Sequence, residues 1–128
     1  MLTFDLVTEQ QTHHLYLKFC DLQTQIETLK GEILILEDQG TLDGHAWYKD
    51  GKYLYLVHHL DQHKQYIGAD PEKQREALAL LDRYAKVKHL SSNLATLEMA
   101  RSASLRLFHT LEDILRTPES YHSTSFYR

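Results

Sequence analysis

A strict heptad repeat between residues 15 and 36 is the feature that most constrains the fold of this chain. Its apolar residues are spaced alternately four and three positions apart over three heptads: Leu15, Phe19, Leu22, Ile26, Leu29, Ile33 and Leu36. This spacing places all seven on one side of a helix, as in the contact surface of a coiled coil. We therefore predict a helix over residues 8–38 that buries these seven residues, the heptad face, against another helix.

The sequence leaves open which helix covers the heptad face. Phenylalanine and isoleucine at one set of core positions, with leucine at the other, favour two-stranded coiled coils, which predicts a homodimer with all seven residues in the oligomer contact. Leaving them exposed would cost roughly 1.5–3 kcal/mol for each large side chain. The alternative is that the heptad face packs against a second helix of the same chain in a small bundle.

Length and composition predict a single globular domain. The chain has 128 residues, of which 42% are hydrophobic and 25% charged, and both values are ordinary for one domain. A single cysteine excludes a disulfide framework within one chain, and the first residues lack the basic and apolar regions of a signal peptide. No apolar run approaches the roughly 18 residues of a membrane helix. We therefore expect a cytoplasmic protein that does not span a membrane.

Between residues 45 and 67 the apolar pattern changes from helical to alternating, which predicts a three-stranded antiparallel meander. Asp50-Gly51 between two alternating runs is a strong signal for a two-residue type I′ turn. Such a turn pairs Lys49 with Lys52. A second loop of two or four residues would pair His59 with Lys64.

This register assigns the strand residues to two faces, because successive side chains of a strand point to opposite sides. The predicted core face consists of Trp47, Leu54, Leu56 and Ile67. The opposite, tyrosine-rich face consists of Tyr48, Tyr53, Tyr55, Val57, His59, Lys64 and Tyr66.

The segment 70–116 is predicted to be helical, and residues 117–128 to form a polar tail. Asp70 is a suitable N-cap, Pro71 fits the first helical position, and no further glycine or proline follows until Pro118. A break is possible at residues 91–93, where serine and asparagine favour caps. An unbroken helix would be roughly 68 Å long and would need a partner along its length. The predicted fold class is therefore α+β, with a long heptad helix, a three-stranded antiparallel meander and a long C-terminal helix or helix pair.

Catalytic, nucleotide-binding and metal-binding motifs are not found in the sequence. The adjacent His58 and His59 would point to opposite faces of a strand, so they could not bind one ion together. We therefore expect a protein that is not an enzyme and that has no cofactor and no metal.

The tyrosine-rich face is the best candidate for a binding surface. Aromatic side chains beside basic ones are typical of surfaces that bind single-stranded nucleic acid, and a sheet can also enter the major groove of a duplex. The predicted nucleic-acid or partner-binding residues are Tyr48, Lys49, Lys52, Tyr53, Tyr55, His59, Lys64 and Tyr66. Two alternatives remain: the long helix could cover this face as core, or the face could bind a protein.

Charge restricts any nucleic-acid contact to a local surface. The net charge of −4 excludes a general affinity for polyanions. Residues 45–90 are the only locally basic region, with eight basic and six acidic side chains. The predicted meander lies in this region, which supports its choice as the binding element.

The run GHAWYKDGKYLYLVHHLDQHKQYIGADPEKQREALALLDRY, at residues 44–84, resembles the amino-terminal arm-binding domains of phage integrases. Both have an aromatic strand, a glycine-containing turn, a tyrosine-rich strand, a polar turn, a strand ending in Tyr-Ile-Gly, and a helix. Residues 22–115 are also similar to a family of small uncharacterised bacterial and archaeal proteins with the order coiled-coil helix, β-meander, long helix. The integrase resemblance implies a sheet inserted into DNA, with Lys49, Lys52 and Lys64 near the phosphates.

Two functions follow as expectations. The first is a nucleic-acid-binding accessory protein, of a phage or other mobile element, that uses the meander. The alternative is an oligomeric protein-interaction module, such as an inhibitor of a host or defence protein.

Overall fold

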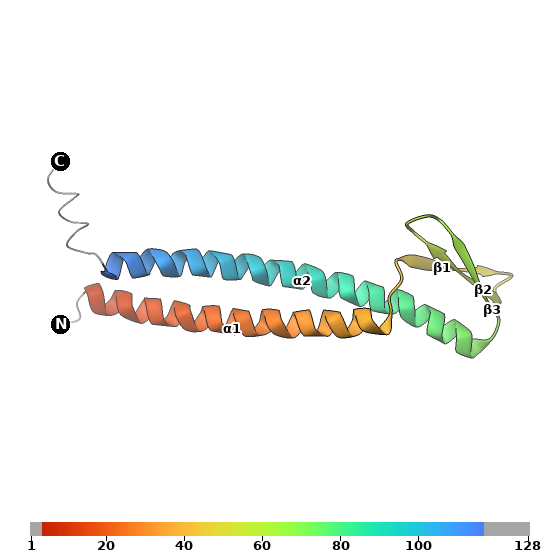
Figure 1. Ribbon diagram of the computed structural model, residues 1–128, viewed down its shortest axis with the longest axis horizontal. Helices are drawn as coiled ribbons and strands as arrows, with labels where there is room; N and C mark the ends of the chain where they lie inside the picture. The colour runs from red at the N-terminus through yellow and green to blue at the C-terminus, as the bar shows by residue number, and fades with distance from the viewer. Residues whose placement is uncertain (1–3, 117–128) are drawn as a thin grey trace. The chain divides into compact units, whose positions relative to one another are not determined.

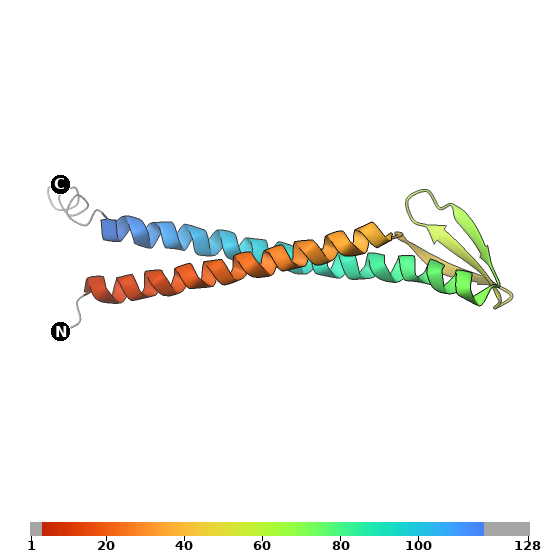
Figure 2. The ribbon, with the colours of Figure 1, turned by 60° about the horizontal axis from the view of Figure 1, so that its bottom comes forward.

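The computed structural model describes residues 4–116, with side chains from Glu9 onward, and consists of two long helices and a small sheet (Figures 1 and 2). The elements are α1 (Phe4–Gln39), β1 (Gly44–Lys49), β2 (Tyr53–His58), β3 (Lys64–Gly68) and α2 (Pro71–Arg116). The predicted α+β class and the predicted order of elements are confirmed. The polar tail predicted at residues 117–128 lies outside the described residues.

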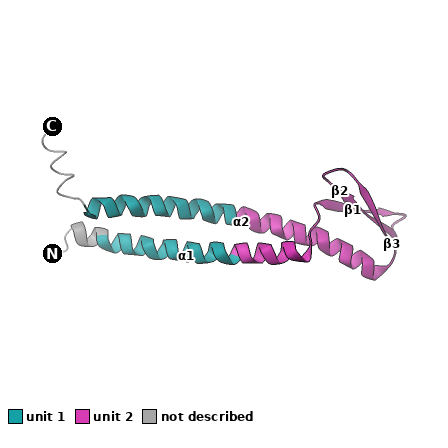
Figure 3. Cartoon of the chain, viewed as in Figure 1, with its two compact units in different colours: residues 1–28, 94–128 teal, residues 29–93 magenta. Residues whose placement is uncertain are grey.

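The chain divides into two compact units (Figure 3). Unit 1 comprises residues 1–28 and 94–128, and unit 2 comprises residues 29–93. Each helix contributes a segment to each unit. Within each unit, the α1 and α2 segments run antiparallel and side by side (Figures 1 and 2). The sheet belongs to unit 2.

The heptad face is covered in part within the single chain. Ile26 is fully buried, and the other six residues of the face are half-buried. In unit 1, Leu15 lies beside Leu107 of α2, and in unit 2, Leu36 lies beside Leu90. The packing of this face on a helix of the same chain is therefore present in the structure. Its contact with a second copy stays a prediction.

Helix α2 runs without a break through residues 91–93, all of which are exposed. From Leu90 onward, eight of its half-buried positions follow a heptad spacing: Leu90, Leu94, Leu97, Arg101, Ser104, Phe108, Leu111 and Leu115; the other two, Glu98 and Glu112, directly follow members of this row. Arg101 is accommodated among apolar residues because its guanidinium donates a hydrogen bond to Oε1 of Gln23 at 3.0 Å. The periodic contacts on both sides of residues 91–93 outweigh their preference for caps.

The C-terminus of α1 is anchored to α2 by polar contacts. Gly40 follows the helix with a left-handed φ of +104°, which glycine adopts without strain. Arg83 of α2 donates from Nε to the carbonyl of Gly40 at 2.6 Å and from Nη2 to that of Gln39 at 3.2 Å. A cation at this position also complements the helix dipole. The N–H of Leu42 then donates to the carbonyl of Leu80 at 3.1 Å, which joins the start of the sheet to α2.

The sheet has the predicted antiparallel order β1-β2-β3, but its first hairpin differs from the prediction by one residue. Asp50 and Gly51 do adopt the left-handed φ values of +56° and +64° that the turn needs. However, Lys49 pairs with Tyr53 and not with Lys52, so the loop has three residues. The predicted pairing of Lys49 with Lys52 is wrong.

A shift of one residue moves every side chain of β1 to the other face of the sheet. Ala46, opposite Leu56, takes the core position that was predicted for Trp47, and Trp47 lies opposite Tyr55. Tyr48 lies opposite Leu54 and leaves the tyrosine-rich face. The physical reason is size, since a methyl group lets α2 approach the sheet where an indole ring would hold it away.

The second hairpin has an even loop, as predicted, but a different pairing. Val57 pairs with Lys64, and His59 lies in the turn. The predicted pairing of His59 with Lys64 is therefore wrong, because His59 is held elsewhere: its N–H donates to the carbonyl of Asp43 at 2.9 Å. Since the loop is even, Tyr66 stays on the face of Tyr55, as predicted.

The core of unit 2 lies between β2 and the first turns of α2. Leu54 and Leu56 are fully buried and pack against Ala77, with Leu42, Ala46, Ile67 and Leu81 around them. Gln74 of α2 donates from Nε2 to the carbonyls of Lys52, at 3.0 Å, and Gly68, at 2.7 Å. Helix α2 therefore covers the face of Leu54 and leaves the tyrosine-rich face uncovered, which rules out the alternative of a helix-covered tyrosine core.

Replacement of Leu54 by alanine tests this core. Leu54 is fully buried, and a leucine-to-alanine change at such a site lowers the free energy of unfolding by about 2–5 kcal/mol. Leu60→Ala is the matched control, because Leu60 is 97% exposed and its loss should change stability by less than about 0.5 kcal/mol. Urea denaturation followed by circular dichroism measures both. Equal stabilities of the two variants would contradict the described core.

Candidate functional site

The uncovered face of the sheet carries a row of aromatic rings, one from each strand. Trp47 of β1, Tyr55 of β2 and Tyr66 of β3 are cross-strand neighbours, and we call them the aromatic platform. The ring centroids of Trp47 and Tyr55 are 5.2 Å apart, and those of Tyr55 and Tyr66 are 5.1 Å apart. Both pairs are inclined, at 57° and 62°, which suits the aromatic quadrupole. The three rings therefore stabilise one another and form a continuous surface.

The platform is open to solvent. Trp47 is 43% exposed and Tyr66 is 59% exposed, while Tyr55 is half-buried between them. Val57 lies on the same face of β2 but is buried, so it contributes to packing and not to the surface. This exposed aromatic area makes the open side of the sheet the candidate interaction surface.

Lysine side chains surround the aromatic platform. The Nζ of Lys64 lies 4.8 Å from the centroid of the Trp47 ring, and that of Lys52 lies 5.5 Å from the centroid of the Tyr53 ring. Lys49 pairs with Tyr53 at the same end of the sheet. Within residues 9–116, none of these three ammonium groups forms an ion pair. Their positive charge is therefore available to an anionic ligand.

Six of the eight predicted binding residues lie in or beside this surface: Lys49, Lys52, Tyr53, Tyr55, Lys64 and Tyr66. Tyr48 does not, because the three-residue loop turns it to the face of Leu54. His59 does not either, because it lies in the β2–β3 turn. The prediction also missed Trp47, which it placed on the core face. The one signal in the sequence is size, because an indole ring fits poorly between a small sheet and the helix that covers it.

His59 belongs to a separate hydrogen-bonded group at the end of the sheet. Its Nδ1 lies 3.0 Å from Oδ1 of Asp43, and its Nε2 lies 2.9 Å from Nδ1 of His45. One of the two facing ring nitrogens must carry the shared proton. This chain of contacts ties the connection before β1 to the β2–β3 turn. In the described part of the chain, no group of three or more histidine, cysteine, aspartate or glutamate side chains is arranged to hold a metal ion.

The chemistry that the platform offers is therefore stacking and charge attraction. Aromatic faces accept planar ligands, and ammonium groups contact anions. Comparisons of the chain with protein-family models, with curated proteins and with solved structures found no match. The two resemblances stated above therefore stay predictions. None of the helices described for residues 4–116 has an apolar stretch long enough to cross a bilayer.

The contact between Lys64 and Trp47 gives a direct test of the observed register. Cation–π pairs at exposed sites contribute about 0.5–1 kcal/mol, so Lys64→Met should lower the free energy of unfolding by about that amount. A double-mutant cycle with Trp47→Leu should return the same coupling energy. Lys49→Met is the control, because Lys49 makes no such contact within the described residues. A coupling energy of zero would contradict the pairing of Trp47 with Tyr55, which brings the ring beside Lys64.

Proposed function

We propose that this protein is a non-enzymatic, cytoplasmic nucleic-acid-binding accessory protein that binds single strands through the aromatic platform. The observation that carries the proposal is the juxtaposition of three aromatic rings with three lysines that form no ion pair among the described residues, on the face of the sheet that α2 leaves open. Bases stack on such rings, and lysines neutralise the phosphates between them. The resemblance to integrase arm-binding domains supports a setting in a phage or other mobile element.

Single strands fit this surface better than a duplex does. Sequence readout in the major groove uses bidentate arginine, asparagine and glutamine side chains at base edges. The centre of the platform instead presents Trp47, Tyr55 and Tyr66, which offer ring faces. A ring face binds an unstacked base, and unstacked bases occur in single strands.

Alanine substitutions in the platform test the proposal. We expect Trp47→Ala and Tyr66→Ala each to weaken binding of fluorescently labelled oligo(dT) or oligo(U), of roughly 16 nucleotides, because stacking contributes about 1–3 kcal/mol per base. This energy corresponds to a loss of about 5- to 150-fold in affinity. Tyr48→Ala is the matched control, since Tyr48 and Trp47 are both 43% exposed but lie on opposite faces. Equal losses for Tyr48→Ala and Trp47→Ala would contradict binding at the platform.

Salt dependence gives a second readout of the same complex. Three phosphate contacts to a single strand predict a log–log slope of about −2, and Lys64→Gln should reduce the magnitude of the slope by about 0.7. The emission of Trp47, the single tryptophan of the chain, should change when bases stack on it. Absence of binding to DNA and RNA strands at about 50 mM salt would reject the proposal, because the electrostatic attraction is strong there.

A specific observation in unit 1 favours a second function, that of an oligomeric interaction module. Among the described side chains of unit 1, only Ile26 is buried, and the apolar residues between its two helix segments stay half-buried. Leu107 is 53% exposed beside Leu15, and Ile114 is 46% exposed. We propose that a second copy packs on this side of α2, so that two helix pairs form a bundle with a common core.

A charged side chain introduced at the proposed contact tests the dimer. Leu107→Glu should convert the protein from dimer to monomer at micromolar concentration, because the dimer would bury an unpaired carboxylate. Ser102→Glu is the control, since Ser102 is also exposed on α2 but lies about 140° around the helix from Leu107. Sedimentation equilibrium measures both. A wild-type protein that is monomeric at these concentrations would exclude the dimer.

A further inference from the structure

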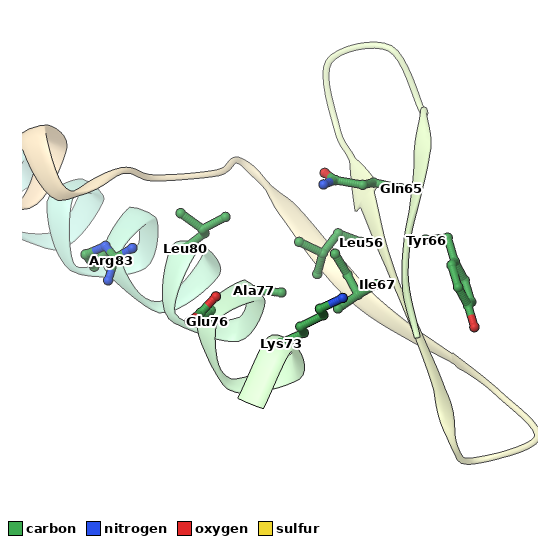
Figure 4. Close-up of a pocket in the computed structure, with 9 residues that line it drawn as sticks. All are labelled: Leu56, Gln65, Tyr66, Ile67, Lys73, Glu76, Ala77, Leu80 and Arg83. Atoms are coloured by element: carbon green, nitrogen blue, oxygen red, sulfur yellow. The ribbon is translucent and has the colours of Figure 1, made fainter. Parts of the chain in front are cut away.

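A groove lies between β3 and α2, on the side of the sheet away from the aromatic platform (Figure 4). It has a volume of about 550 Å³, which is within the range of ligand sites. Gln65 and Ile67 line it from β3, and Lys73, Ala77 and Leu80 line it from α2. The Tyr66 ring points away from it, toward the platform (Figure 4). Tyr66 also lines the groove, so the groove and the ring faces of the platform lie on opposite faces of one sheet and adjoin at this residue.

The strand beside the groove has a free edge. In the described chain β3 pairs with β2 alone, so its other edge has no neighbouring strand. The N–H of His58 donates to the carbonyl of His63 at 2.8 Å, which marks these two residues as a hydrogen-bonded pair. In an antiparallel ladder such pairs recur every second residue. The backbone groups of Lys64 and Tyr66 therefore point away from β2, toward the free edge.

An edge with outward N–H and C=O groups is a template for a further strand. Side chains of an added strand alternate between its two faces, so every second one would point to the side of the groove. The groove lining is mixed: Gln65, Lys73 and Glu76 are polar, Leu56 and Ala77 are buried beneath it, and the half-buried Ile67 and Leu80 give it an aliphatic part. Short aliphatic side chains fit this aliphatic part.

The charged side chains of the groove add a further requirement on the ligand. The Lys73 side chain extends from α2 across the groove toward β3 (Figure 4). Among the described residues its ammonium group has no ion-pair partner. The other cation in the groove, Arg83, is occupied by the carbonyls of Gln39 and Gly40. Glu76 also lines the groove, so its lining carries both signs of charge (Figure 4). Lys73 is the group available to a single carboxylate on an incoming ligand.

We propose that β3 and α2 form a docking site for an extended peptide segment of a partner protein that carries one acidic residue and pairs with the free edge of β3 as a fourth strand. Its backbone hydrogen-bonds to Lys64 and Tyr66, its alternate aliphatic side chains enter the groove, and its carboxylate contacts Lys73. The proposal does not depend on nucleic-acid binding, because the two surfaces lie on opposite faces of the sheet.

Peptide selection tests the proposal on the full chain. Random peptides of about ten residues, the upper length of ordinary strands, are displayed on phage and selected against the protein. We expect the enriched sequences to alternate aliphatic with polar residues and to carry an acidic residue. A selection that enriches no peptide, or only basic ones, would overturn the proposal.

The most enriched peptide is then synthesised with a fluorescent label and measured by fluorescence polarisation. Lys73→Glu should weaken its binding about tenfold, as expected for the loss of one charge-assisted hydrogen bond. Lys88→Glu is the matched control, because it places the same charge on an exposed position of α2 outside the groove. Equal affinities for both variants would overturn the role of Lys73, and thermal melting of each variant verifies that it is folded.

Alternate N-methylation of the peptide distinguishes strand addition from other binding modes. Only every second N–H of an added strand faces β3. Methylation at one set of alternate positions should abolish binding, and methylation at the other set should leave it unchanged. Equal effects would overturn the fourth-strand geometry.

Two other results would also overturn the proposal. Loss of peptide binding in Trp47→Ala would place the peptide on the platform. Self-association of the protein through β3 would identify a second copy as the occupant.

Discussion

The packing of Leu54 and Leu56 on Ala77 determines which face of the sheet is available for binding. Both leucines are fully buried, and the small side chains of Ala46 and Ala77 let helix and sheet approach closely. Once α2 covers this face, the alternation of side chains along each strand directs Trp47 and its neighbours to the other face. The aromatic platform is therefore a consequence of helix packing as much as of composition.

A three-stranded sheet of five- and six-residue strands needs support to be stable. Here the support is polar as well as apolar. Arg83 holds the end of α1, Gln74 holds the carbonyls of Lys52 and Gly68, and Asp43 holds the β2–β3 turn through His59. These contacts anchor the connections at both ends of the meander. The platform is thus carried on a sheet whose backbone is held in place, which suits a surface that binds through ring orientation.

The two proposed binding surfaces differ in chemistry because they differ in what α2 covers. The open face offers rings and ammonium groups that form no ion pair within the described residues, and these suit bases and phosphates. On the covered face a groove lies beside β3, with a mixed lining, a backbone edge and Lys73, which has no ion-pair partner among the described residues; these suit an extended peptide with one acidic residue. Occupied together, they would place a partner protein next to a nucleic-acid strand. Such an arrangement is consistent with an accessory role.

Local patterns in the sequence were sufficient to predict the elements and most of the site. The heptad spacing predicted α1, the alternating runs predicted three strands, and six of the eight predicted binding residues lie in or beside the platform. The tertiary structure decided the register of β1, and with it the exchange of Trp47 and Tyr48 between the faces, as well as the helix that covers the heptad face. The reason is that Asp50 and Gly51 accept left-handed angles in a loop of either two or three residues. Only the fit of Ala46 under α2, a contact between residues far apart in the chain, selects between the two.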